Sequence, residues 1–554
     1  MKDANAEVDR LAAECWDALM TAEPTWAHLL GDTSRAGEHE SVSRESEQRV
    51  AAAWRSYAGR AEAIDPSTLD EEHRLTRDVL LFEAGTRAEL ADAGLAEHAA
   101  DPIFGPQVSL PVLFGMLGVP DAEVAELLLA KAEGIGRYYT ELAERQRDGV
   151  ASGRVSPAFA VAGTVEQIDA ALAVPPAEDP LLTAVRLPAD VDPAAWRARF
   201  AAALERWVRP AMAAYRDVLR EEVMPVARPD DRVGLCWLPD GEEAYARTLR
   251  FFTTTAKTPQ EIHDVGLAQV AALAEEYRAL GPAVAGTDDL EAIFEAMRSD
   301  PALHFRRSEE LVEAAEVAMA RAWQAMPEWF EVLPQAPCTV EGVTSGAKAY
   351  YFPPATDGSR GGTFFINVED ATSWGTFEVE SLAFHEGIPG HHLQLAIASE
   401  LPDTVPAIRR FSENAAYAEG WGLYTERLAD EMGLYSSDVQ RLGMLSADSL
   451  RACRLVVDTG MHALGWSRQQ AVDYMVANSP MTEGICRPEV DRYVVSPGQA
   501  TSYMIGRLEI QRIRREAEAR PGFDLKRFHS AVLDGGALPL GVLERRVRAR
   551  LGNP

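Results

Sequence analysis

Apolar residues recur at intervals of three and four along most of this chain, which is the spacing of amphipathic helices. Near the start, Val8, Leu11, Trp16, Leu19 and Met20 follow this pattern. The helices predicted in this way cover residues 5–30, 45–63, 71–95, 121–148, 192–223, 258–280, 288–299 and 308–326. Two stretches rich in proline, at 101–120 and 174–192, interrupt the pattern and predict a loop and a connector.

The pattern changes near Pro334, where β-branched and aromatic residues predict short strands. The predicted strands cover 338–340, 349–352 and 363–368, and the glycine-rich turn 357–362 joins the last two as a hairpin. Helices follow, one capped by Thr376 and others over 412–432 and 501–516. These elements predict a mainly α fold with one small β-sheet.

The length of 554 residues allows two domains or one large helical body. We expect a helical N-terminal subregion over 1–330 that forms a cleft wall, and a catalytic subregion over 331–554 with the sheet. The two should form one continuous structural unit.

Composition and charge limit the kinds of molecule that this protein is expected to bind. The formal net charge is −32, from 54 basic and 86 acidic residues, which disfavours nucleic acid and anionic membranes through repulsion. The five scattered cysteines include no C-x-x-C pair, which argues against a thiolate metal site. The start of the chain lacks the apolar core of a signal peptide, and no stretch approaches the length of a membrane span. We therefore expect a cytoplasmic protein.

Three of the chain's eleven histidines lie within eight residues, together with a glutamate, in the sequence His385-Glu386-Gly387-Ile388-Pro389-Gly390-His391-His392. Zinc hydrolases bind the metal through two histidines of one helix, usually spaced H-E-x-x-H, and the glutamate takes a proton from the activated water. Here the spacing differs. On a straight helix His391 would point about 120° away from His385, and His392 would lie about 10 Å along the axis.

A straight helix therefore cannot bring either His391 or His392 to the same metal ion as His385. Pro389 removes a backbone donor, and Gly387 and Gly390 permit unusual dihedral angles, so we expect the helix to bulge or kink and return a later histidine to the metal. His391 is our choice for the second ligand, with His392 as the alternate.

This stretch resembles the signature of the DUF885 family, metallopeptidase-like proteins grouped with the gluzincins. Further matching blocks are Tyr417-Ala418-Glu419-Gly420-Trp421-Gly422-Leu423-Tyr424, Arg454 to His462, and Pro497-Gly498-Gln499-Ala500-Thr501-Ser502-Tyr503. The N-terminal half matches loosely, through Pro24-Thr25-Trp26 and Leu29-Leu30-Gly31. In gluzincins a glycine precedes the second histidine ligand, as Gly390 precedes His391. The resemblance implies one Zn²⁺ per chain, with Glu419 as third ligand and Glu413 as its alternate.

Other polar residues of these blocks are candidates for the site. Arg454, Asp458 and His462 recur every four residues and form one polar stripe on a helix, as a cleft wall or an internal ion network. His462 and Tyr503 are candidates to stabilise the oxyanion. The residues expected to contact substrate are Tyr350, Tyr351, Arg454, Asp458, Arg492, Tyr493 and Gln499.

The function expected from these residues is zinc-dependent hydrolysis of amide or peptide bonds in short peptides or small amides. Glu386 would act as general base and later protonate the leaving amine. Two alternatives stay open: a metal-dependent enzyme for a specialised metabolite intermediate, and a binding protein without activity. A homodimer is compatible with the sequence.

Overall fold

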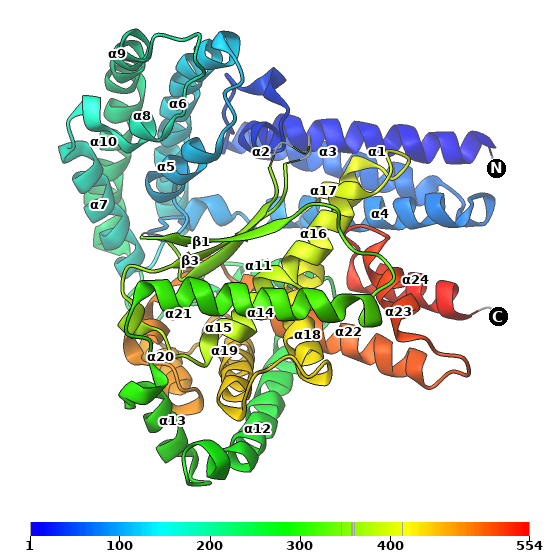
Figure 1. The fold of residues 1–554 in the computed structure, drawn as a ribbon. Helices are drawn as coiled ribbons and strands as arrows, with labels where there is room; N and C mark the ends of the chain where they lie inside the picture. The colour runs from blue at the N-terminus through cyan, green and yellow to red at the C-terminus, as the bar shows by residue number, and fades with distance from the viewer. Residues whose placement is uncertain (1, 345, 356–357, 359, 413, 553–554) are drawn as a thin grey trace.

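The computed structural model describes residues 2–344, 346–355, 358, 360–412 and 414–552. It is mainly helical, with one small three-stranded sheet, as the sequence predicts (Figure 1). Both ends of the chain lie on the same side of the molecule. Among the described residues, no helix is both long and apolar enough to cross a bilayer.

Fourteen α-helices of the described chain precede the sheet. They are α1 (Lys2–Ala22), α2 (Pro24–Leu29), α3 (Arg44–Ala63), α4 (Glu71–Ala91), α5 (Pro106–Met116), α6 (Ala122–Ser152), α7 (Ala158–Ala173), α8 (Pro180–Ala184), α9 (Pro193–Ala203), α10 (Arg209–Val218), α11 (Gly241–Thr253), α12 (Pro259–Val284), α13 (Leu290–Ser299) and α14 (Ser308–Trp329). Their starts follow capping chemistry. Thr258, for example, accepts from the backbone N–H of Glu261, whose side chain binds back, in a complete capping box.

The structure corrects two of the predicted N-terminal elements. The stretch 101–120, predicted as a loop, contains α5, which begins with Pro106 and keeps Pro111 inside because Leu110 and Phe114 are buried. The single helix predicted over 5–30 is two helices, α1 and α2, because Pro24 starts a new helix after Glu23.

The sheet consists of β1 (Cys338–Val343), β2 (Ala349–Phe352) and β3 (Gly362–Asn367), in the order β1-β3-β2. Strands β2 and β3 form the predicted antiparallel hairpin, with Tyr350 opposite Phe365, whereas β1 pairs with β3 in parallel. Residues 356, 357 and 359 of the predicted turn lie outside the described residues. Phe364 and Ile366 of β3 are fully buried and join the core beside α14.

Ten helices follow the sheet among the described residues. They are α15 (Glu378–Leu382), α16 (His391–Glu400), α17 (Ala407–Phe411), α18 (Ala415–Glu431), α19 (Asp438–His462), α20 (Arg468–Asn478), α21 (Glu483–Val495), α22 (Ser502–Glu518), α23 (Leu525–Leu533) and α24 (Leu540–Gly552). Thr376 does not cap α15 as predicted, because its hydroxyl donates instead to the carbonyl of Leu303.

The central helix of the molecule is α19, which is buried along most of its length. It packs lengthwise against α12, and α18 packs in the same way against α22 (Figure 1). The buried residues of the core beside the sheet range in sequence from Leu75 to Val547. Those of a second core range from Ala93 to Ile505. Both cores therefore include residues from each side of position 330.

Candidate metal centre

His385 and His391 belong to two separate helical segments. Helix α15 continues into a π-helical turn, Ala383–Gly387, which carries His385, and the helix then ends. The Ile388–Pro389 peptide bond is cis, and α16 begins at His391. We expected the helix to bulge or kink here, and the structure has a π-helical turn at His385 followed by a break between the two helical segments.

The break brings the two histidine side chains together, with ring centroids 4.7 Å apart. A Cβ atom on Gly390 would lie 1.8 Å from the carbonyl oxygen of His385, so only glycine allows this return of the chain. The indole N–H of Trp421 donates to the carbonyl of Pro389 at 3.0 Å and ties the break to α18.

Glu419, on α18, completes a group of three potential ligands. Its Oε2 atom lies 3.4 Å from Nε2 of His385 and 3.4 Å from Nε2 of His391. The three ligand atoms all lie within 4.8 Å of one another. The sequence expectation of His385, His391 and Glu419 as one cluster therefore agrees with the geometry. The alternate Glu413 lies outside the described residues.

The ring of His385 is held in one orientation by α18. Its Nδ1–H donates to Oε1 of Glu426 at 2.7 Å, which leaves Nε2 facing Glu419. Ser381 donates to the other oxygen of Glu426 at 2.6 Å. Gly422 allows the close approach, because a Cβ atom there would lie 2.7 Å from the ring of His385.

His392, the alternate ligand, is directed away from this cluster. The hydroxyl of Tyr351 lies 2.8 Å from its Nδ1, and its Nε2 lies 3.0 Å from the carbonyl oxygen of Ala336. Burial lowers the pKa of His392 to about 4, so the ring is neutral. Both ring nitrogens are engaged, which leaves no lone pair for a metal.

The charges around His385 favour a cation at the cluster. Burial disfavours protonated His385, but hydrogen bonds to Glu419 and Glu426 outweigh it and raise the pKa of His385 to about 9. Despite burial, the two histidines hold the pKa of Glu419 well below its usual value. Two imidazoles and one carboxylate, with a further carboxylate orienting one imidazole, are the donor set of a catalytic zinc site. The residues present therefore fit a divalent metal ion.

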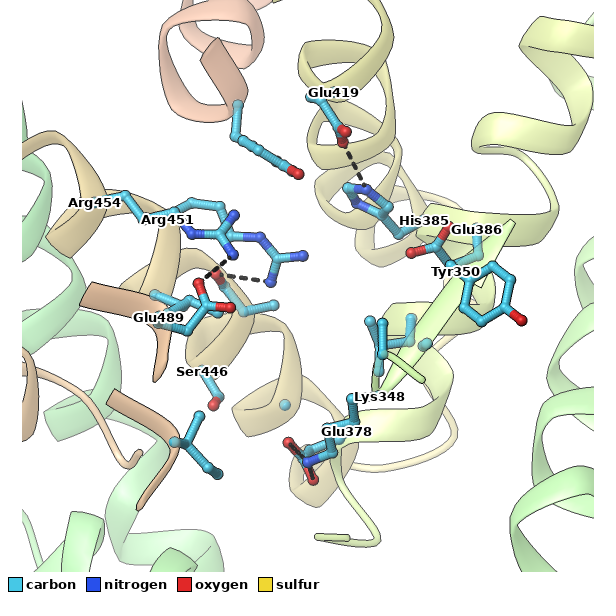
Figure 2. Close-up of a pocket in the computed structure, with 18 of the residues that line it drawn as sticks. Lys348, Tyr350, Glu378, His385, Glu386, Glu419, Ser446, Arg451, Arg454 and Glu489 are labelled. Carbon is cyan, nitrogen blue, oxygen red and sulfur yellow. Dashed lines mark hydrogen bonds and ion pairs between the residues drawn. The ribbon is translucent and has the colours of Figure 1, made fainter. Parts of the chain in front are cut away.

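A cavity of about 440 Å³ opens onto the three potential ligands. Of the residues predicted from sequence, Glu386, Tyr350, Tyr351, Arg454 and Tyr503 line this cavity. Figure 2 shows the Glu386 carboxylate beside His385 on the side of the open space. The Tyr503 ring stacks on the His385 ring, with centroids 6.5 Å apart. Burial raises the pKa of Tyr503, so its hydroxyl keeps its proton at neutral pH.

Five other predicted residues do not line the cavity, namely His462, Asp458, Arg492, Tyr493 and Gln499. His462 is fully buried, accepts from the N–H of Leu235 at 3.1 Å, and donates to the Tyr493 carbonyl at 3.0 Å. This corrects the expectation that it faces the oxyanion. Asp458 is also buried, where it accepts from the Tyr245 hydroxyl and from the Gly498 N–H.

Arg492, Tyr493 and Gln499 form a network behind the cavity wall. Arg492 donates to Gln499 at 2.8 Å and to Glu489 at 3.2 Å, and the Tyr493 hydroxyl also donates to Glu489. They support Arg454, which donates to Tyr493 and Glu489. In the predicted polar stripe, Arg454 therefore lines the cavity, whereas Asp458 and His462 are buried in the protein interior.

Sequence reasoning assigned no role to several polar residues of the site. Glu426 lies seven residues after Glu419 and so on the same helix face, which was the available signal. Arg451 lies one turn before Arg454 and lines the same cavity. Glu489 and the pair Lys348–Glu378 also line it, and no motif in the sequence marks them (Figure 2).

The fold and the site together define a mainly helical protein with one small sheet and a His-His-Glu cluster whose two histidines are buried. The chain belongs to the DUF885 family, described as "Bacterial protein of unknown function", whose family model matches residues 24–547. The match begins at Pro24 and includes the N-terminal half, which resembles the family only loosely by its motifs.

Solved structures share this architecture. A candidate lipoprotein from Colwellia psychrerythraea has a TM-score of 0.92 at 25% identity, with 100% of each chain covered. A candidate lipoprotein of unknown function from Shewanella oneidensis has a TM-score of 0.76 at 20% identity, with 97% of this chain and 99% of the other covered. The search of curated proteins gave no match.

Proposed function

We propose that this protein is a zinc-dependent hydrolase of the gluzincin type that cleaves amide bonds in short peptides or small amides. The observation that carries the proposal is the convergence of His385, His391 and Glu419 within 4.8 Å, at the wall of a cavity that Glu386 also lines. Three protein ligands are the number that leaves a catalytic zinc one open position.

Each residue of the site has a chemical role in this proposal. His385, His391 and Glu419 would hold the ion, which when bound lowers the pKa of water and polarises a carbonyl group. Glu386 lines the cavity beside His385, so its carboxylate would take a proton from water and deliver it to the leaving amine. The Tyr503 hydroxyl would donate to the carbonyl oxygen as negative charge develops there.

The dimensions of the cavity support small substrates. A volume of about 440 Å³ is that of a site for small molecules, which range over about 300–1,000 Å³. Helices α19 and α21 form one wall of it, and strand β2 forms another. We therefore expect short peptides or small amides, rather than folded protein segments, as substrates.

Metal analysis of matched variants tests the proposal. We expect about one zinc per chain in the wild type and in His392→Ala, and none in His391→Ala, with all three folded by circular dichroism. The same preparations are then screened against dipeptides, tripeptides and simple amides. Loss of zinc in folded His392→Ala alone would overturn the ligand set. A zinc-loaded wild type that hydrolyses none of these compounds would overturn the activity.

A further inference from the structure

Arg451 is a cavity-lining cation whose hydrogen-bonding capacity is mostly unused. It lies on α19, and its side chain is only 9% exposed. Nη1 donates to the carbonyl of Ala447 at 3.2 Å, and the buried Nε has no hydrogen-bond partner among the described residues. Its one ion pair within the described chain is a distant one, 3.9 Å from Nη2 to Oε1 of Glu426. A buried guanidinium is costly without a charged partner.

The two other cations of the cavity have close partners. Nζ of Lys348 lies 2.8 Å from both oxygens of Glu378. Arg454 donates to Glu489 at 2.9 Å (Figure 2). Arg451 therefore differs from both, since the carboxylate nearest to it already binds His385 and Ser381.

Arg451 also shares its cavity with the three potential ligands. The Glu426 oxygen nearest to Nη2 is the atom that binds Nδ1 of His385 at 2.7 Å. The guanidinium carbons of Arg451 and Arg454 lie 5.9 Å and 4.6 Å from the ring centre of Tyr503, which stacks on His385. A group bound by Arg451 would therefore lie in the same cavity as an amide at the cluster.

We propose that Arg451, with Arg454 beside it, binds the carboxylate of the substrate, so that the preferred substrates are peptides and N-acyl amino acids cleaved at their last amide bond. This inference rests on the proposed hydrolase function and names its substrate class. Water adds to the carbonyl carbon, the C–N bond breaks, and the departing nitrogen takes a proton. The products are an acid and a free amino acid.

Two features of the cavity refine the ligand. Leu450, Met481 and Ile485 line it near Arg451, which favours an apolar side chain on the released residue. Glu386 and Glu489 also line it, so a doubly charged phosphate would be repelled more strongly than a carboxylate. A planar guanidinium matches a carboxylate through paired N–H donors.

Direct binding tests the inference without catalysis. The probes are N-acetyl-L-phenylalanine and its uncharged amide, titrated calorimetrically into metal-free protein, so that the carboxylate cannot bind an ion. We expect the acid to bind at least about tenfold more tightly than the amide, as charge-assisted hydrogen bonds imply. Arg451→Met should abolish this preference and Arg451→Lys should keep part of it. Arg441→Met, at a half-buried position of the same helix that does not line the cavity, should keep all of it.

The outcomes separate this inference from the proposed function. Equal binding of acid and amide by the wild type, or an unchanged preference in folded Arg451→Met, would overturn the inference. Displacement of the acid by an equal concentration of inorganic phosphate would show an unselective anion site and would also overturn it. Arg451-dependent binding in a protein that hydrolyses neither benzoylglycyl-phenylalanine nor its amide, even with zinc, would keep the carboxylate site at Arg451 and refute the hydrolase. Equal hydrolysis of the acid and its amide would support the hydrolase and overturn the preference for a carboxylate.

Discussion

Glu419 and Glu426 lie two turns apart on one face of α18 and approach opposite nitrogens of the same imidazole, that of His385. Glu419 lies 3.4 Å from Nε2, and Glu426 accepts from Nδ1 at 2.7 Å. One helix thus supplies both a potential ligand and the carboxylate that orients a second ligand. This arrangement makes the two glutamates separable by mutation, because only Glu419 approaches both histidines.

Glu426→Gln should weaken metal binding without removing it. The amide retains the shape of the side chain but loses the charge that fixes the ring of His385, and loss of such an orienting partner typically costs about 10- to 100-fold in affinity. Competition with a chromophoric chelator measures the affinity. Glu431→Gln, on the exposed part of the same helix, is the matched control. Equal affinities for the two variants would contradict the assigned role.

Gly422→Ala should impair the metal centre although alanine favours helices. A methyl group there would lie 2.7 Å from the His385 ring and must displace it. At Gly85, in α4, no atom lies within 4 Å of the added methyl group, so the same substitution should be neutral or stabilising by up to about 1 kcal/mol. Zinc content and thermal unfolding of both variants measure these effects. Full zinc content in Gly422→Ala would refute the close approach.

Glu386→Gln should bind zinc normally and lose hydrolysis. Glu386 lines the cavity but does not belong to the cluster of potential ligands, so its amide removes the proton acceptor and leaves the metal site complete. The expected fall in kcat is about 10²- to 10⁴-fold, the usual contribution of general acid–base catalysis. Zinc analysis and steady-state kinetics on a short peptide measure both properties. A variant with wild-type kcat would assign the proton transfer to another group.

Asp458 should make the protein less stable as the pH rises from about 4 to about 7. Burial raises the pKa of Asp458 from 3.8 to about 7, against hydrogen bonds from Tyr245 and Gly498. The folded state therefore holds a proton that the unfolded state releases near pH 4. The resulting stability is complete below that pH and is lost as the pH rises through about 7.

Asp458→Asn imitates the protonated form and should remove this dependence. The unfolding free energies of wild type and variant, measured in urea at several pH values, should diverge between pH 4 and 7 by up to about 4 kcal/mol. The difference between the two proteins cancels the titration of every other group. Parallel curves would show that Asp458 is ionised throughout this range.

The amino-acid pattern was sufficient for most of the elements. Helical periodicity and capping residues predicted α3, α6 and α12 to within a few residues, and β-branched and aromatic residues predicted the hairpin. It failed for α5, where Pro106, Pro111 and the glycines indicated a loop. Burial of Leu110 and Phe114 in a core of distant helices outweighs that local preference, and such burial is absent from a local pattern.

Within the site, the local motif accounts for which residues are close in sequence, and the tertiary structure accounts for what their side chains contact. The sequence by itself determined that His385, Glu386 and two further histidines lie in one short segment and that Pro389 excludes a straight helix there, because these are constraints on neighbouring backbone atoms. Only the tertiary structure decided that His392 is occupied by Tyr351, that His462 faces the interior, and that Arg451 faces the cavity. These depend on contacts between residues tens to hundreds of positions apart, and a helical period specifies a face but not what that face meets.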